Sequence, residues 1–342
     1  MIEPETQPAH PGAERRLRLL SVVAPMYNEE GTAEAFYSRV VSALDGVPFE
    51  LILVDDCSSD ATPQILGRLA ENDPRVRILF LSRNFGHQAA LSAGLDAASG
   101  DATVMLDGDL QDPPEVINEM LARWREGYEV VFAQRTRREG ETKLKLATAR
   151  WFYKFFARVT RVDLAGNAGD FRLLDRSALD ALRSMRERNR FLRGMSVWIG
   201  FRQIAVPYER DARMAGETKY TWRKMAKFAV DAISSFSWVP LQAATLLGFV
   251  FSIVAFISLP FVIVARYSGI YVPGVSSVLF VILLLGGIQL ITVGLIGEYV
   301  GRIYDEVKRR PLYLVRERVN VPGGSEPYAE SEEEQEERLR AP

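Results

Sequence analysis

The sequence predicts an α/β protein with a mostly parallel sheet, followed by a membrane-associated C-terminal part. Three observations predict it. Short apolar runs alternate with helix-like stretches in the first half of the chain, which is typical of strands joined by crossover helices. Polar clusters follow three of these runs, at 27–29, 55–56 and 107–109. Two later stretches, 241–264 and 267–297, contain no charged residue.

The expected elements alternate in order along the chain. Strands are expected at 19–24, 49–54, 76–81, 102–106 and 130–133. Helices are expected after a turn at 25–30 as far as 44, and at 62–72, 86–98, 113–127 and 142–159. In such sheets ligands bind at the carboxyl ends of the strands, where the three polar clusters fall. A single cluster is as consistent with a solvated turn as with a site, but three at successive strand ends favour a site.

The later part of the chain predicts a two-helix transmembrane hairpin with spans at 241–264 and 274–297, because each uncharged stretch exceeds the roughly 20 residues that cross a bilayer. Apolar residues at helical spacing with basic neighbours predict an amphipathic helix before it, lying in the headgroup layer. The chain then divides into a disordered N-terminus (1–16), an α/β domain (17–218), the amphipathic helix (219–237), the hairpin region (238–300), a cytoplasmic segment (301–321) and an acidic disordered tail (322–342).

Basic residues predict the orientation of this hairpin. They precede the first span and follow the second, whereas the link between the spans carries only Arg266. The flanking basic residues are Arg223, Lys224, Lys227, Arg302, Lys308, Arg309 and Arg310. Because basic flanks stay on the cytoplasmic side, we expect a multi-pass protein of the inner (cytoplasmic) membrane with the α/β domain and both termini in the cytoplasm.

Composition narrows the chemistry further. The formal net charge is −2, so charge gives no reason to expect a nucleic-acid partner. The single cysteine, Cys57, excludes an intramolecular disulfide and a cysteine zinc site, and His10 and His87 are too few for a histidine cluster. A metal would therefore be held mainly by oxygen ligands, which favours Mg²⁺ or Mn²⁺.

The strongest motif is the run DGDLQDPPE at 107–115. Asp107 and Asp109 stand one residue apart at the end of a buried strand, where carboxylates can approach one divalent cation. Such a cation can bridge the two phosphates of a nucleoside diphosphate and neutralise charge on a leaving group. An Asp-x-Asp pair alone is weak evidence, because it occurs by chance in many loops.

This run and two others carry a resemblance to a known family. APMYNEE at 24–30, VDDCSSD at 54–60 and DGDLQDPPE at 107–115 resemble the signature set of family 2 glycosyltransferases, which have the Rossmann-like GT-A fold. Within that family the chain resembles the polyprenyl-phosphate sugar transferases, which include dolichol-phosphate mannose synthase and the bacterial bactoprenol glucosyl transferases. The resemblance covers about 19–310, and the two-span layout is closer to the bacterial group.

The resemblance implies roles for the motif residues. Residues that would bind the nucleotide-sugar are Pro25, Tyr27, Glu29, Asp55, Asp56, Asp107 and Gly108. Asp109 and Gln111 would be ligands of Mg²⁺ or Mn²⁺. The implied activity is inverting transfer of a hexose, most simply glucose from UDP-glucose, onto polyprenyl (undecaprenyl) phosphate. No second carboxylate is placed for a double displacement.

A fourth segment, GNAGDFRL at 166–173, resembles the acceptor-side motif of the family. It makes Asp170 a candidate catalytic carboxylate beside Asp107. The alternative is a turn in which Asp170 pairs with Arg172. A general base is scarcely needed, because a phosphate monoester has a second pKa near 6 and is already anionic at neutral pH.

Cations are needed for the acceptor phosphate and the diphosphate. Arg135 follows the 130–133 strand, and Arg210, Arg213 and Lys219 follow later, with Arg213 and Lys219 the better candidates of these three. An arginine fork matches phosphate oxygens, so these residues are candidates for phosphate and acceptor binding. The alternative is a basic surface attracted to anionic lipid.

Other activities remain open from the sequence. The donor could instead carry mannose on GDP, an N-acetylhexosamine or aminoarabinose. A processive polysaccharide synthase is disfavoured because the chain lacks a Gln-x-x-Arg-Trp motif, and an inactive scaffold because the acidic motif residues are intact. The resemblance also admits a homo-oligomer through the membrane region, where the small residues at 286–287 and 294 would permit close helix contact, although the sequence does not determine the oligomeric state.

Overall fold

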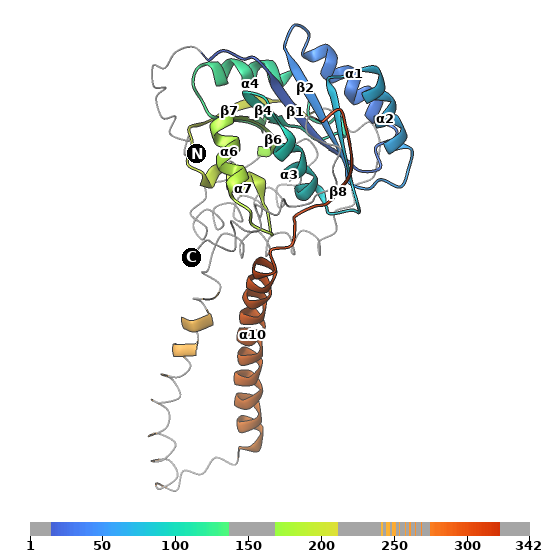
Figure 1. Ribbon diagram of the computed structural model, residues 1–342. Coiled ribbons are helices and arrows are strands. Elements are labelled where there is room, and N and C mark those ends of the chain that lie inside the picture. Colours follow the sequence, from blue (N-terminus) through green and yellow to red (C-terminus); the bar gives the residue numbers. More distant parts are fainter. Residues whose placement is uncertain are drawn as a thin grey trace, which may run out of the picture. The chain divides into compact units, whose positions relative to one another are not determined.

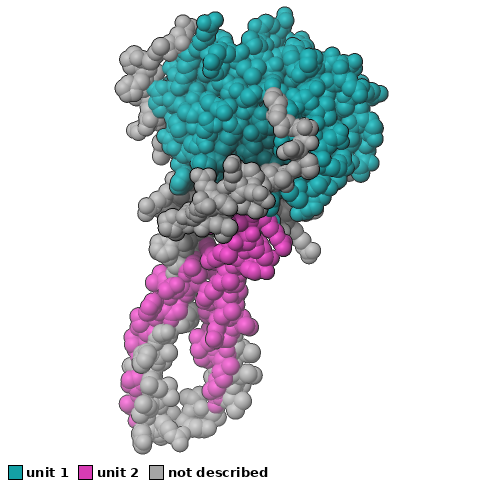
Figure 2. Space-filling model, viewed as in Figure 1, with its two compact units in different colours: residues 1–157, 162–219, 311–342 teal, residues 158–161, 220–310 magenta. Residues whose placement is uncertain are grey.

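The computed structural model describes residues 15–136, 168–210 and 274–321, together with single residues between 241 and 268 (Figure 1). The chain forms two compact units (Figure 2). The first contains residues 1–157, 162–219 and 311–342, and the second contains residues 158–161 and 220–310. The predictions for 1–14, 142–159, 219–237 and 322–342 lie outside the described residues.

The first unit contains an eight-stranded sheet in the order β7-β5-β6-β4-β1-β2-β3-β8. Its strands are β1 (Leu20–Met26), β2 (Phe49–Asp55), β3 (Val76–Leu81), β4 (Ala102–Met105), β5 (Val130–Arg135), β6 (Ala168–Asp175), β7 (Gln203–Tyr208) and β8 (Val315–Val319). Only β6 and β8 run antiparallel to their neighbours. The predicted mostly parallel α/β sheet is confirmed, and the strands that the sequence analysis did not predict are β6, β7 and β8.

Helices cover both faces of this sheet. They are α1 (Ala33–Ala43), α2 (Thr62–Asn72), α3 (His87–Ala97), α4 (Val116–Arg125), α6 (Arg176–Ser184) and α7 (Leu192–Trp198). The buried apolar residues of α1, α2 and α4 join those of the strands in the main core, while α3 packs on the other face. α1 begins later than predicted because the backbone N–H groups of Thr32 and Ala33 first close a turn on the Glu29 carbonyl, at 3.0 and 2.9 Å.

Close packing of α3 on the sheet depends on one glycine. All seven residues of β2 are buried, as expected for a central strand covered on both faces. A Cβ atom added to Gly94 in α3 would lie 2.3 Å from Cγ1 of Val23 and 3.1 Å from Cγ2 of Val54. Gly94 therefore lets the helix approach β1 and β2 closely.

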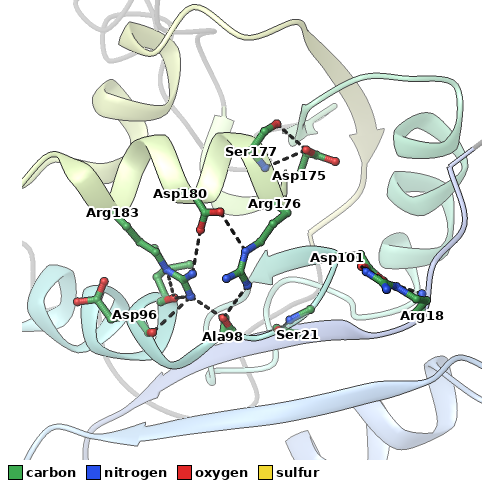
Figure 3. Close-up of polar contacts among 12 residues, drawn as sticks. Arg18, Ser21, Asp96, Ala98, Asp101, Asp175, Arg176, Ser177, Asp180 and Arg183 are labelled. Carbon is green, nitrogen blue, oxygen red and sulfur yellow. Dashed lines mark hydrogen bonds and ion pairs between the residues drawn. The ribbon is translucent and has the colours of Figure 1, made fainter. Parts of the chain in front are cut away.

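The amino ends of the strands are held by paired charges (Figure 3). Arg176 and Arg183 from α6 both donate to the carbonyl of Ala98, just beyond the C-terminus of α3. Asp180 accepts from both arginines, at 3.1 and 3.0 Å, and so fixes their orientation. Cations near a helix C-terminus satisfy its last carbonyls and complement its dipole, so this cluster ties α3 to α6.

The second unit contains α10 (Val275–Val307). Its stretch Leu284–Val307 is long and apolar enough to cross a membrane, and none of it is buried. The second predicted span therefore coincides with a helix, although this helix continues past 297. Only single residues of the first predicted span are described, so the two-helix hairpin stays a prediction.

The chain beyond α10 contributes a strand to the first unit. The sequence analysis assigned 301–321 to a cytoplasmic segment, but Val315–Val319 forms β8, which pairs antiparallel with β3 (Figure 1). The side-chain amide of Asn320 donates to the carbonyls of Ala70 and Val76, at 2.8 and 3.0 Å. Residues that follow the apolar helix therefore complete the sheet, and a domain ending at 218 is too short.

Candidate functional site

The carboxyl edge of the sheet has unusual backbone in three loops. Asn28 follows β1, Cys57 follows β2 and Leu110 follows β4, with φ angles of 56°, 60° and 59°. Non-glycine residues with positive φ are uncommon, and strained backbone of this kind clusters at functional sites. The three loops are those in which the sequence analysis found polar clusters.

The loops after β1 and β2 are joined by side-chain hydrogen bonds. The Asn28 amide oxygen accepts from the Ser59 backbone N–H at 2.9 Å, and the Asn28 backbone N–H donates to Ser58 Oγ at 3.0 Å. The Glu29 backbone N–H donates to Thr62 Oγ1 at 2.8 Å. Tyr27 remains 49% exposed between these contacts. The two loops thus form one rigid rim with an accessible aromatic ring.

Asp55 and Asp56 have different surroundings. Asp56 accepts from the backbone N–H groups of Phe85 and Gly86, at 2.7 and 2.9 Å, and so holds the loop between β3 and α3. Asp55 is 1% exposed, and its carboxylate accepts from the Ser58 backbone N–H at 3.3 Å and from the Ser58 side chain. Burial raises the pKa of Asp55. The two carboxylates thus differ in role, since Asp56 holds a second loop and Asp55 is bound within its own.

The loop after β4 lies directly on the end of β1. A Cβ atom at Gly108 would be 2.5 Å from Sδ of Met26 and 3.2 Å from the carbonyl oxygen of Pro25. A side chain at this position would have to displace the end of the Met26 side chain, so glycine favours this approach, which brings Asp107 and Asp109 beside the rim formed by the first two loops. Asp109 accepts from the Gln111 backbone N–H at 3.1 Å.

The donor set of this loop fits a hard divalent cation. Gln111 is 7% exposed, and its Oε1 atom has no hydrogen-bond partner in the part of the chain that the structure describes. Among the described residues no group of three or more His, Cys, Asp or Glu side chains gathers as a metal cage. Mg²⁺ is commonly bound by one or two protein oxygens with water and substrate phosphates, so Asp109 and Gln111 suit a cation that the substrate helps to hold.

Asp112 forms a second centre with residues from β5 and β7. The Tyr208 hydroxyl donates to Asp112 Oδ1 at 2.5 Å, and Arg135 donates to the Tyr208 oxygen at 3.0 Å. Arg135 and Arg210 approach the same carboxylate oxygen at 3.7 and 3.3 Å, and Arg210 lies 3.9 Å from Asp109. Arg135 and Arg210 therefore both face the buried Asp112 carboxylate, and Arg210 also lies near Asp109, so an anionic ligand at this place would meet two guanidinium groups already in position.

Asp170 stands at the start of β6 in a third centre. Arg193 Nε lies 3.3 Å from Asp170 Oδ1, while Gln88 Nε2 and His87 Nε2 lie 3.3 and 3.5 Å from Oδ2. Burial alone would raise the pKa of Asp170, but the His87 hydrogen bond and the charge of Arg193 outweigh it and hold the pKa well below its usual range. Asp170 is therefore an ionised carboxylate at neutral pH.

His87 connects this centre to the loop after β4. Its Nε2 atom lies 3.6 Å from Asp107 Oδ1 and 3.5 Å from Asp170 Oδ2. Burial raises the pKa of Asp107 to about 6, against the opposing charge of His87. Two carboxylates that the sequence analysis assigned to catalysis are thus brought together by a histidine to which it gave no role.

The structure places most of the predicted site residues on one edge. Pro25, Tyr27, Glu29, Asp55, Asp56, Asp107, Gly108, Asp109, Gln111, Arg135 and Asp170 all lie at or just beyond the ends of strands on this edge. Arg213 and Lys219 lie outside the described residues. The turn pairing of Asp170 with Arg172 is replaced by the Arg193 ion pair, and the Arg172 guanidinium donates to the Gly169 carbonyl and to Ser196.

The sequence analysis gave no role to His87, Asp112, Arg193 or Tyr208. His87 had a usable signal, because it follows the third strand as the acidic clusters follow the others. Asp112 lies within the DGDLQDPPE run, although nothing there indicated its partners. Arg193 and Tyr208 carried no local signal, since their partners are distant in the sequence.

A mostly parallel sheet with acidic loops on its carboxyl edge belongs to the α/β proteins that bind ligands at that edge. The model of the Glycosyl transferase family 2 matches residues 21–183. A glycosyltransferase of Synechocystis sp. is 46% identical over 299 residues, covering 86% of this chain and 94% of the relative. The chain therefore belongs to glycosyl transferase family 2, and the resemblance seen in the sequence is confirmed.

Two relatives have more specific names. The prophage bactoprenol glucosyl transferase homolog of Escherichia coli is 41% identical over 300 residues, covering 87% of this chain and 98% of that protein. The bactoprenol glucosyl transferase of Shigella phage SfII is 40% identical over 300 residues, covering 87% of this chain and 97% of that protein. The similarity to these proteins extends over nearly their whole length.

Proposed function

We propose that this chain transfers a glucosyl group from UDP-glucose to undecaprenyl phosphate at the cytoplasmic face of the membrane. The observation that carries the proposal is the similarity to bactoprenol glucosyl transferases over 97% of the length of the phage protein. An apolar helix at Leu284–Val307, suited to a bilayer, supports a lipid-linked acceptor.

The donor nucleotide binds the rim formed by the loops after β1 and β2. Tyr27 offers an exposed aromatic face to the base, and Asp55 offers a carboxylate oriented by Ser58. Pro25 and Gly108 shape the floor between the rim and the loop after β4. Glu29 and Asp56 act indirectly, because their hydrogen bonds hold the loops that form this pocket.

The sugar diphosphate lies over the loop after β4. Asp109 and Gln111 would hold Mg²⁺ or Mn²⁺, and the cation would supply charge neutralisation for the leaving diphosphate. Arg135 and Arg210 stand beside Asp112 and Asp109 and supply fixed positive charge to phosphate oxygens. Arg213 and Lys219 are proposed to extend this basic surface toward the lipid phosphate.

The reaction is a single displacement. An oxygen of the lipid phosphate attacks the anomeric carbon, the bond from that carbon to the diphosphate oxygen breaks, and the nucleoside diphosphate leaves with the electron pair. The configuration at the anomeric carbon inverts. Because the acceptor is already anionic, the ionised Asp170 serves to orient the sugar and stabilise positive charge at the anomeric carbon.

The experiment that tests this function uses the full chain in membranes with undecaprenyl phosphate. UDP-glucose, GDP-mannose and UDP-N-acetylglucosamine, each radiolabelled in the sugar, are compared by the label extracted into the lipid phase. We expect lipid label from UDP-glucose that depends on added undecaprenyl phosphate. If only GDP-mannose gave lipid label, the donor in the proposal would be GDP-mannose and the sugar mannose. If no donor gave lipid label, the proposed function would be rejected.

A further inference from the structure

Strand β8 has a bulge beside the donor pocket. Its register on β3 runs from Val319 opposite Ile78 to Glu317 opposite Phe80, and then shifts so that Val315 is opposite Leu81. Arg316 is the extra residue at this shift. Bulges at sheet edges next to active sites often re-aim a side chain.

The bulge is level with Asp55. On the other side of β3, Asp55 of β2 pairs with Phe80, so the row of the sheet that contains Asp55 reaches β8 at Glu317, and Arg316 is the bulged residue next to it. Strands lie about 4.8 Å apart, which puts β8 about 10 Å from β2 in this row. A long side chain can cover most of that gap, so Arg316 lies at the border of the donor pocket.

Charge supports the same placement. Arg316 is exposed, and among the residues that the structure describes none forms a hydrogen bond or ion pair with its guanidinium. Its charge is nevertheless close enough to Asp55 to lower the pKa of that carboxyl, against the larger effect of burial. An exposed guanidinium beside a buried carboxylate presents donors and an acceptor to one planar ligand.

We propose that Arg316 completes the donor pocket by donating to a carbonyl oxygen of the nucleobase while Asp55 accepts from the neighbouring ring N–H. This inference rests on the proposed function. Uracil and guanine both present a carbonyl next to a ring N–H, whereas cytosine and adenine present an amino group there. The pair would therefore select keto bases, and a strand that follows the apolar helix would set base specificity.

Arg318 provides a matched control on the same strand. It lines a cavity with Leu79 of β3 and Ala93 and Asp96 of α3, on the face of the sheet that α3 covers. Asp55 lies two residues after Leu53 on β2 and so shares its face, and Leu53 belongs to the main core on the face opposite α3. Removing Arg318 therefore removes the same charge from β8 without touching the side of the sheet that carries Asp55.

The test measures nucleotide binding to the full chain in detergent with Mn²⁺ by calorimetry, using UDP, CDP, GDP and ADP. We expect the wild type to bind the keto member of at least one pair (UDP over CDP, or GDP over ADP) at least tenfold more tightly, because an unmatched donor or acceptor in the pocket is costly. Arg316→Ala should reduce that preference about tenfold, and Arg318→Ala should leave it unchanged.

Two outcomes would overturn the inference. If Arg316→Ala kept the same preference for keto bases, Arg316 would make no contact with the base. Equal weakening of all four nucleotides would assign the guanidinium to the diphosphate instead. Failure of the wild type to bind any of the four would be a different result, because it would reject the nucleotide-sugar function itself and take the base contact with it.

Discussion

The two edges of the sheet carry similar residues in different arrangements. At the amino edge two carboxylates each pair with one arginine, Asp101 with Arg18 at 2.8 Å and Asp73 with Arg75 at 2.8 Å (Figure 3 shows the first). The two arginines that share Asp180 there also donate to the carbonyl of Ala98. At the carboxyl edge the groups are shared, since His87 lies between two carboxylates and Asp112 between two guanidinium groups.

The arrangement of charged partners therefore distinguishes structural residues from functional ones better than residue type does. A matched pair has little left to offer a ligand, so its role is to hold the chain. A shared or unmatched set retains charge and acceptor capacity, and Gln111 Oε1 is buried there with no hydrogen-bond partner among the described residues. Substitutions at the two edges should accordingly affect different measurements: turnover at the carboxyl edge and stability at the amino edge.

The largest effect is expected for Asp109→Ala. Loss of a metal ligand at the diphosphate should lower transfer about a thousandfold, because charge on the leaving group is no longer neutralised. Transfer into undecaprenyl phosphate and the melting temperature are measured together. The melting temperature should stay unchanged. Full activity of the variant would show that Asp109 is not a metal ligand.

Asp170→Asn should lower kcat about a hundredfold, because it removes the negative charge that His87 and Arg193 hold in place. KM for the nucleotide-sugar should change little. A raised KM with unchanged kcat would instead make Asp170 a substrate-binding residue without a role in the chemical step.

Tyr208→Phe should lower activity about tenfold. The substitution keeps the ring, which packs edge-on against Phe171 at 5.9 Å, and removes only the hydroxyl that joins Asp112 to Arg135. Steady-state kinetics with varied polyprenyl phosphate should show the loss mainly in the acceptor KM. A loss confined to the melting temperature would make this centre structural.

Asp101→Ala should act on stability alone. The Asp101 carboxylate accepts from the backbone N–H groups of Arg18 and Leu19, at 2.7 and 3.2 Å. Removing it should lower the free energy of unfolding by about 1 kcal/mol, measured by urea denaturation of the purified protein. Turnover of the folded variant should match the wild type. A large loss of kcat would contradict the claim that residues at the amino edge act on stability alone.

The smallest effect concerns pH. Arg75 hydrogen bonds hold the pKa of Asp73 at about 2, below its usual 3.8. Because the folded-state pKa is lowered, Asp73 stabilises the fold above about pH 4, and this stabilisation is lost as the pH falls toward 2. Melting temperatures between pH 2 and 7 should fall less steeply for Asp73→Asn, and parallel curves would contradict this.

The same contrast explains what the sequence could predict. The strands β1 to β5 and the acidic loops that follow β1, β2 and β4 are local features, because burial pattern and turn chemistry lie within a few residues of each other. Asp109 and Asp55 could therefore be placed at the carboxyl edge of the sheet before the fold was known. Arg193, Tyr208 and strand β8 could not, because their contacts join segments far apart in the chain, and β8 follows an apolar helix that breaks the sequence pattern.

The central claim is that the loop after β4 holds a divalent cation for transfer to a lipid phosphate. The most direct measurement is transfer of labelled glucose from UDP-glucose to undecaprenyl phosphate in excess chelator, followed by stepwise return of Mn²⁺ or Mg²⁺. We predict that lipid label disappears in chelator and returns with the metal. Equal transfer in the presence and absence of chelator would contradict the claim.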